Sequence, residues 1–103
     1  MKVYFANCHT DIDWEYPGGN GADYKEIPNS AKTSEIAAFP KVLAAIRHAI
    51  GQDKLLSIAV PGKKIDMIAY TAETGPLIWP SVDYINVSLP PHIFSALSFK
   101  ILD

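Results

Sequence analysis

Acidic and bulky side chains alternate along residues 11–16, which read Asp-Ile-Asp-Trp-Glu-Tyr. A period of two is typical of a β-strand, whose successive side chains point to opposite faces. The pattern therefore predicts a strand with three carboxylates on one face and three large groups on the other: Asp11, Asp13 and Glu15 against Ile12, Trp14 and Tyr16. The proline and glycines that follow predict its end, and residues 17–32 are expected to form a long polar loop.

A helix is expected next, over residues 34–50. Its apolar residues recur at three- and four-residue steps, which places them on one stripe: Ile36, Phe39, Leu43, Ile46 and Ile50. Thr33 or Ser34 can cap the start, and Gly51 stands where a helix often terminates. Pro40 lies beyond the first turn, so we expect a kink or a later start of the helix.

Residues 55–60, Leu-Leu-Ser-Ile-Ala-Val, form an almost unbroken apolar run that ends at a proline. Such a run is typical of a strand covered on both faces in a parallel sheet. We expect a shorter helix from Lys64 to about Thr71 and a strand over 82–87, while residues 3–6 could form another short strand. Right-handed crossovers would place three parallel strands side by side with helices on one face. This is an α/β architecture, either an open sheet or part of a barrel.

Composition narrows the possible functions. The 103 residues suit one small domain, and 49% hydrophobic residues are enough for a core. The net charge of -2 and the scattered Lys and Arg residues argue against nucleic acid or a membrane surface as a partner. The single Cys8 allows no internal disulfide, and no Cys/His spacing suggests zinc. No apolar run is long enough for a membrane span or a signal peptide, and localisation stays open.

The acidic face is the best candidate for chemistry. Asp13 and Glu15 are two residues apart on the predicted strand, so their Cα atoms would lie roughly 6.6 Å apart. Two like charges this close do not both ionise easily, and one proton is retained near neutral pH. A proton on Glu15, at the carboxyl end of the strand, is what a general acid needs to protonate a leaving sugar oxygen. Asp11 lies one step deeper and would tune the sharing of this proton.

Other interpretations use the same residues. Three carboxylates on one face could be a solvated strand edge. An Asp-x-Asp pair can also hold a divalent metal and a nucleotide sugar, although no phosphate-binding glycine loop opens a helix here. A helix-loop-helix calcium site is excluded, because its sixth and twelfth positions would be Tyr16 and Ala22 instead of Gly and Glu.

Residues 11–18, Asp-Ile-Asp-Trp-Glu-Tyr-Pro-Gly, resemble the end of the fourth barrel strand in family-eighteen glycoside hydrolases, the chitinases, whose pattern is Asp-Gly-x-Asp-x-Asp-x-Glu. The similarity continues through residues 34–40, 56–62 and 80–87, and it is closest to the fungal branch. The resemblance implies a partial TIM (β/α)8 barrel comprising strands four to six. It covers residues 11–87, and it leaves residues 1–10 and 88–103 unmatched at the two ends.

The resemblance also implies an activity. This family hydrolyses β-1,4-linked N-acetylglucosamine in chitin with retention, and the acetamido oxygen of the substrate is the nucleophile. Glu15 would be the proton donor, Asp13 would orient the acetamido group, and Asp11 would support Asp13. Tyr16 is a candidate substrate-binding residue, with packing beneath a helix as the alternative. Chitin or chitooligosaccharides would be the partners, no metal or organic cofactor is implied, and members of the family are commonly extracellular.

The chain departs from the family pattern at both ends of the match. The family's first Asp and Gly fall on Cys8 and His9, and its Met-x-Tyr-Asp falls on residues 88–91, Ser-Leu-Pro-Pro. A complete barrel takes roughly 250 residues. A second hypothesis is therefore a truncated, catalytically inactive chain with at most weak chitin binding, or self-association through exposed sheet edges. A third, an unrelated small α/β binding module, requires the acidic match to be chance.

Overall fold

The computed structural model describes residues 1–6, 8–19 and 25–88, so part of the predicted polar loop and the segment from residue 89 onward lie outside the described residues. The described chain forms one mixed sheet with the strand order β1-β2-β3-β4. The four strands are β1 (Lys2–Ala6), β2 (His9–Asp13), β3 (Leu55–Pro61) and β4 (Tyr84–Ser88). No helix in this part of the chain is long and apolar enough to cross a bilayer.

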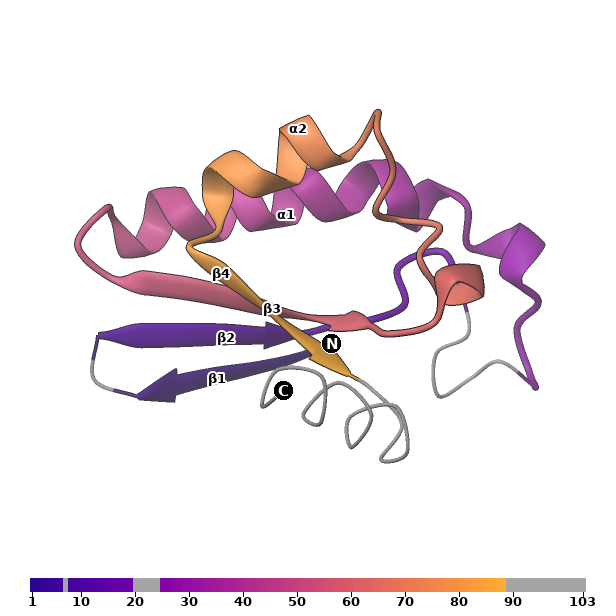
Figure 1. The fold of residues 1–103 in the computed structure, drawn as a ribbon, viewed down its shortest axis with the longest axis horizontal. Coiled ribbons are helices and arrows are strands. Elements are labelled where there is room, and N and C mark those ends of the chain that lie inside the picture. Colours follow the sequence, from indigo (N-terminus) through magenta and orange to yellow (C-terminus); the bar gives the residue numbers. More distant parts are fainter. Residues whose placement is uncertain (7, 20–24, 89–103) are drawn as a thin grey trace, which may run out of the picture.

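The three strands β2, β3 and β4 are parallel neighbours. The long helix α1 (Ser34–Ile50) connects β2 to β3, and the short helix α2 (Gly75–Ile78) precedes β4. Figure 1 shows both helices on the same side of the sheet. The predicted arrangement of three parallel strands with helices on one face is confirmed. The last strand starts at Tyr84, later than the expected residue 82, and a 3-10 turn over residues 79–81 precedes it.

Strand β1 runs antiparallel to β2, with Lys2 opposite Asp13 and Ala6 opposite His9. The strands of a (β/α)8 barrel are all parallel. Strand β1 therefore does not continue the barrel pattern, although it does form the short strand expected near the amino terminus. It covers the backbone hydrogen-bonding edge of β2 that a preceding parallel strand would otherwise take.

Helix α1 packs its apolar stripe against the helix-facing side of the sheet. The buried core joins residues of β2, β3, α1 and α2: Ile12, Phe39, Leu43, Leu56, Ile58, Val60 and Ile78. The helix runs from Ser34 through Pro40, so a later start is wrong, and Pro40 itself is buried. Thr33 is the N-cap residue but makes no side-chain capping bond. Gly51 ends the helix with φ 81° and donates to the Arg47 carbonyl at 3.0 Å.

The predicted helix from Lys64 to Thr71 is wrong. A 3-10 turn covers Lys64–Asp66, and the apolar side chain of Ile65 is 81% exposed. Hydroxyl groups take the place of helical backbone bonds further on: the Thr74 hydroxyl donates to the Ala69 carbonyl at 2.7 Å and accepts from the Thr71 amide at 2.8 Å. Such local side-chain bonds compete with a helix, and helical structure resumes only at α2.

Candidate active site

Strand β2 presents Asp11 and Asp13 on the sheet face that carries no helix, because Ile12 between them is fully buried in the core beneath α1. The strand ends at Asp13, so the predicted strand through Tyr16 is too long. Its neighbours explain the end: pairing with β3 stops at Ile12, and β1 begins opposite Asp13. Glu15 therefore lies just beyond the strand, at the carboxyl edge of the sheet.

Asp11 is tied to the next strand. Its Oδ1 atom accepts a hydrogen bond of 2.6 Å from the hydroxyl of Ser57, which stands directly opposite in the β2–β3 register. Ser57 is completely buried. A buried hydroxyl needs a partner, so this bond both satisfies Ser57 and fixes the Asp11 carboxylate.

Glu15 is held from two other elements. The hydroxyl of Ser88, the last residue of β4, donates to Glu15 Oε1. The Tyr70 hydroxyl donates to the Glu15 backbone carbonyl at 3.4 Å. Glu15 thus reaches across the sheet to the carboxyl end of β4, and it remains partly exposed. Parallel α/β sheets bind ligands at these carboxyl ends.

The three acids do not form one hydrogen-bonded cluster. The bonds of Asp11 and Glu15 lead to serines on β3 and β4, and within the described residues neither acid bonds to Asp13. Asp13 instead has Lys2 of β1 as its cross-strand neighbour. The predicted closeness of Asp13 and Glu15 assumed a strand that runs through both residues. In the structure β2 ends before Glu15.

Two tyrosines lie beside the acidic edge. Burial raises the pKa of Tyr16, and the carboxylates of Glu15, Asp66 and Asp13 raise it further. Burial also raises the pKa of Tyr70 well above its usual value, with a further contribution from Glu15. Both phenols are therefore kept neutral and able to donate. Asp66 comes from the turn after β3, and its proximity to Tyr16 was not foreseen from the sequence.

Three aromatic rings in edge-to-face contact support the segment that carries Glu15. The Trp14 ring meets Phe39 of α1 edge to face, with centroids 5.5 Å apart, and Phe39 meets Tyr70 in the same way at 5.9 Å. Edge-to-face pairs of this kind are favourable beyond the area that they bury. The contact with Phe39 places Trp14 on the helix side of the sheet, which agrees with its predicted place opposite the acids.

The start of α1 clamps the turn behind Glu15. The Gly18 amide donates to Glu35 Oε1 at 2.9 Å, and the Lys32 ammonium donates to the Gly19 carbonyl at 3.3 Å. Gly18 has φ 77°, and a Cβ atom there would lie 2.5 Å from Ile36 Cγ1. A residue without a side chain is therefore required at this position.

A second polar group adjoins the acids and was missed from the sequence. His9 Nε2 lies 2.8 Å from the Ser57 hydroxyl and 2.9 Å from the Tyr84 hydroxyl, and the His9 and Tyr84 rings are 5.5 Å apart. Asp11, Ser57 and Tyr84 stand in one row across β2, β3 and β4. The sequence offered one signal for His9: it stands two residues before Asp11, so a strand places both on the same face. The register that brings Ser57 and Tyr84 next to His9 cannot be predicted from any local sequence pattern.

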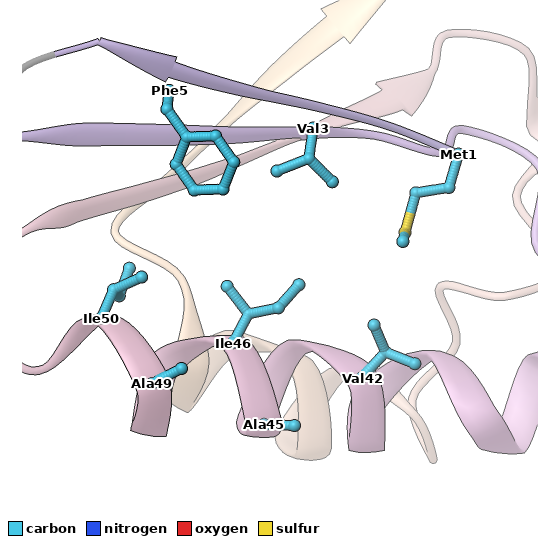
Figure 2. Close-up of a pocket in the computed structure, with 8 residues that line it drawn as sticks. All are labelled: Met1, Val3, Phe5, Val42, Ala45, Ile46, Ala49 and Ile50. Carbon is cyan, nitrogen blue, oxygen red and sulfur yellow. The ribbon is translucent and has the colours of Figure 1, made fainter.

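A separate hollow lies between β1 and α1 and measures about 600 Å³ (Figure 2). Its lining is entirely apolar: Met1, Val3, Phe5, Val42, Ala45, Ile46, Ala49 and Ile50. It lies on the helix side of the sheet and contains no group that could orient a sugar hydroxyl, so it is not part of the acidic site.

Among the described residues, no group of three or more His, Cys, Asp or Glu side chains could hold a metal ion.

Parallel strands, helices on one face and carboxylates at the carboxyl edge define an α/β chain of the type that builds (β/α) barrels. The model of Glycosyl hydrolases family 18 matches residues 10–89, and the chain belongs to this family. The family drawn from the sequence is confirmed, whereas its fungal branch and the numbering of the barrel strands stay predictions. The sheet is consistent with a partial TIM barrel of this family. The family is chitinase-like, with carbohydrates such as chitin as substrates. Comparison with curated proteins and with solved structures gives no match.

Proposed function

We propose that this chain is the acid-bearing part of a chitinase and that it cleaves β-1,4 linkages between N-acetylglucosamine units with Glu15 as proton donor. The observation that carries the proposal is the place of Glu15 within the family match: it lies two residues beyond the end of β2, at the carboxyl edge of the parallel strands, and is partly exposed. A carboxylic acid there can reach a leaving-group oxygen and later regain its proton from water.

Asp13 and Asp11 have supporting roles in this proposal. The substrate's acetamido oxygen attacks the anomeric carbon, and Asp13 orients the acetamido group and stabilises the positive charge that develops on it. Asp11 supports Asp13 from the same strand face and is itself held by Ser57. Tyr16, a neutral phenol beside Glu15, is proposed to contact the sugar. In this scheme β2, β3 and β4 correspond to the fourth, fifth and sixth strands of the barrel.

The test is release of a fluorophore from a chitobiose or chitotriose glycoside by the purified chain. Glu15→Gln keeps the shape of the side chain and an oxygen that can accept from Ser88, but it removes the transferable proton. Glu73→Gln is the matched control, because it removes one carboxylate from an exposed position outside the site. Turnover by the wild type and the control that is lost in Glu15→Gln supports the proposal.

A second candidate follows from the open geometry of the site. The described sheet has no opposite wall over its acidic face, and all five residues of β4 are exposed. On this alternative the chain is catalytically inactive and binds chitin weakly or associates with itself. Absence of turnover from a chain that circular dichroism shows to be folded, together with retention on chitin beads or concentration-dependent assembly, favours this candidate over hydrolysis.

A further inference from the structure

His9 is the residue of β2 that the family match does not cover, since the match begins at residue 10. Its imidazole nevertheless joins the same hydrogen-bonded chain as Asp11. Ser57 is the link: its Oγ atom lies 2.6 Å from Asp11 Oδ1 and 2.8 Å from His9 Nε2. One fully buried hydroxyl thus connects the imidazole to a proposed site carboxylate.

The number of protons fixes the direction of these bonds. Ser57 has one hydroxyl proton and donates it to Asp11, because an ionised carboxylate can only accept. The remaining lone pairs of Ser57 must then accept from His9, which requires a proton on Nε2. The Tyr84 oxygen, 2.9 Å from the same nitrogen, lies within reach of that proton as a second acceptor. Either the Nε2–H tautomer or the doubly protonated imidazolium satisfies this arrangement.

We propose that His9 is a positioning residue for Asp11, acting through the Ser57 hydroxyl, so that the charges of His9 and Asp11 are coupled. A positive imidazolium polarises the Ser57 hydroxyl toward Asp11 and strengthens the bond that holds the carboxylate. The catalytic consequence rests on the proposed function, in which Asp11 supports Asp13. The coupling itself does not, because it needs only the observed hydrogen bonds.

Other charged and titratable groups also lie around His9, and the measurement must separate their effect on His9 from that of Asp11. Tyr84 of β4 faces the ring directly, and Asp83, which precedes β4, interacts with the charge of His9. Tyr4 of β1 stands opposite Asp11 in the sheet, and Ser57, the contact from β3, carries no charge. Asp11 is the carboxylate joined to the ring by a hydroxyl bridge, so removing its charge has a larger effect on His9 than removing a distant one.

The experiment is an NMR titration of the histidine rings in the full chain. Asp11→Asn is expected to weaken proton binding at His9 by about fourfold or more, because fourfold is the size expected for unit charges about 5 Å apart in bulk water and the effect grows nearer the protein interior. Glu73→Gln, a charge removal at an exposed position, should leave the His9 midpoint unchanged. His48, exposed on α1, serves as the internal reference in each sample. A His9 midpoint that is the same in Asp11→Asn and wild type overturns the proposal.

Ser57→Ala gives an independent test that leaves both charges in place. It removes the bridge, so the ¹⁵N shift of His9 Nε2 should move and the effect of Asp11→Asn on the His9 midpoint should shrink. If the ¹⁵N shift is unchanged, the proposed bridge is wrong. Circular dichroism of each variant establishes that the fold is retained before the midpoints are compared.

Activity separates this proposal from the proposed function. Where the chain turns over the fluorogenic substrate, His9→Gln should lower kcat more than it raises KM and shift the acid limb of the pH–rate profile. Turnover with an uncoupled His9 overturns the positioning role and leaves the hydrolase proposal standing. Coupling observed in a folded chain without turnover sustains the His9–Asp11 link and rejects hydrolysis by this chain.

Discussion

The Arg47 guanidinium of α1 meets the Asp83 carboxylate, just ahead of β4, with 2.6 Å between Nη2 and Oδ2. Arg47 also donates to three backbone carbonyls, those of Ser81, Gly51 and Lys54, at 2.7 to 3.0 Å. Its side chain is almost completely buried. One residue of the helix therefore ties together the helix end, the entry to β3 and the entry to β4.

Replacing Arg47 with Met is expected to lower the free energy of unfolding by about 3 kcal/mol. Methionine refills much of the volume, but it leaves the buried Ser81 carbonyl without its donor, which costs about 1 to 3 kcal/mol, and it removes the partly buried bonds to Gly51, Lys54 and Asp83. Urea unfolding followed by circular dichroism measures the change. Lys41→Met, which removes an exposed cation from the same helix, should stay within about 0.5 kcal/mol of wild type. Equal losses in the two variants would contradict a special role for Arg47.

Asp83 should make stability depend on pH in the acid range. The Leu56 amide, 2.7 Å away, and then the Arg47 guanidinium hold the pKa of Asp83 below its ordinary value of 3.8. The native state therefore binds fewer protons than the unfolded state at acid pH, so this contribution is present above about pH 4 and is lost as pH falls through the native pKa. Unfolding curves of wild type and Asp83→Asn should differ by a constant amount near neutrality and converge in acid. A gap that widens in acid would show the opposite sign.

Two glycines with positive φ offer a matched comparison. Gly51→Ala meets open space and carries only the backbone strain of φ 81° and ψ −175°, a region that is essentially restricted to glycine, at a cost of about 1 to 3 kcal/mol. Gly18→Ala also places a side chain at a positive φ, 77°, and in addition drives its Cβ into Ile36, so we expect it to cost about 1 to 3 kcal/mol more than Gly51→Ala. Thermal unfolding of the two variants provides the measurement. A larger loss of stability in Gly51→Ala than in Gly18→Ala would show that Ile36 moves easily to accommodate a side chain at Gly18.

The parallel core of the fold could be predicted because each element carried its own local signal. The apolar stripe of α1 and the run over residues 55–60 agree with their buried positions. The segment over 64–71 lacked such agreement: its apolar residues have helical spacing, but the threonine hydroxyls that follow capture backbone groups. Strand β1 was expected, whereas its antiparallel pairing depends on a partner edge that no local pattern specifies.

The candidate site could be predicted only as a set of acids. Alternation identified Asp11 and Asp13 as neighbours on one face, and the family pattern singled out Glu15. The alternation of acidic and bulky residues predicted a strand that continues beyond Asp13, and this was wrong. A strand continues only where neighbouring backbone is available to pair with it. Ser57 and Ser88 reach the acids through the register of β3 and β4, a relationship between residues far apart in the chain.

Tyr70 should stabilise the fold mainly through its ring. Tyr70→Phe removes the 3.4 Å hydrogen bond to the Glu15 carbonyl but keeps the contact with Phe39, so a loss of about 1 kcal/mol or less is expected. Tyr70→Ala removes the ring as well, and a loss of about 3 kcal/mol is expected. Because burial raises the pKa of Tyr70, the contribution of its neutral form is complete below pH 10 and declines as pH rises through the native value. Urea unfolding of both variants at neutral and alkaline pH checks the order and the sign.

Strand β4 forms one outer edge of the described sheet. Within the described residues no strand pairs with its outer side, and Val87 is 50% exposed. An exposed apolar edge is a template for another chain, and a lysine on it opposes such pairing. If the chain associates through this edge, Val87→Lys should lower the weight-average mass measured by sedimentation equilibrium.

Leu77→Lys is the matched control for this edge, since it introduces the same charge at a 61% exposed position on α2. It should assemble like the wild type, because α2 lies on the helix side of the sheet (Figure 1). Equal dissociation of both variants would point to a general effect of charge instead of strand pairing. A wild-type chain that stays monomeric at every concentration would remove self-association from the proposed functions and leave sugar binding at the acidic edge as the alternative to hydrolysis.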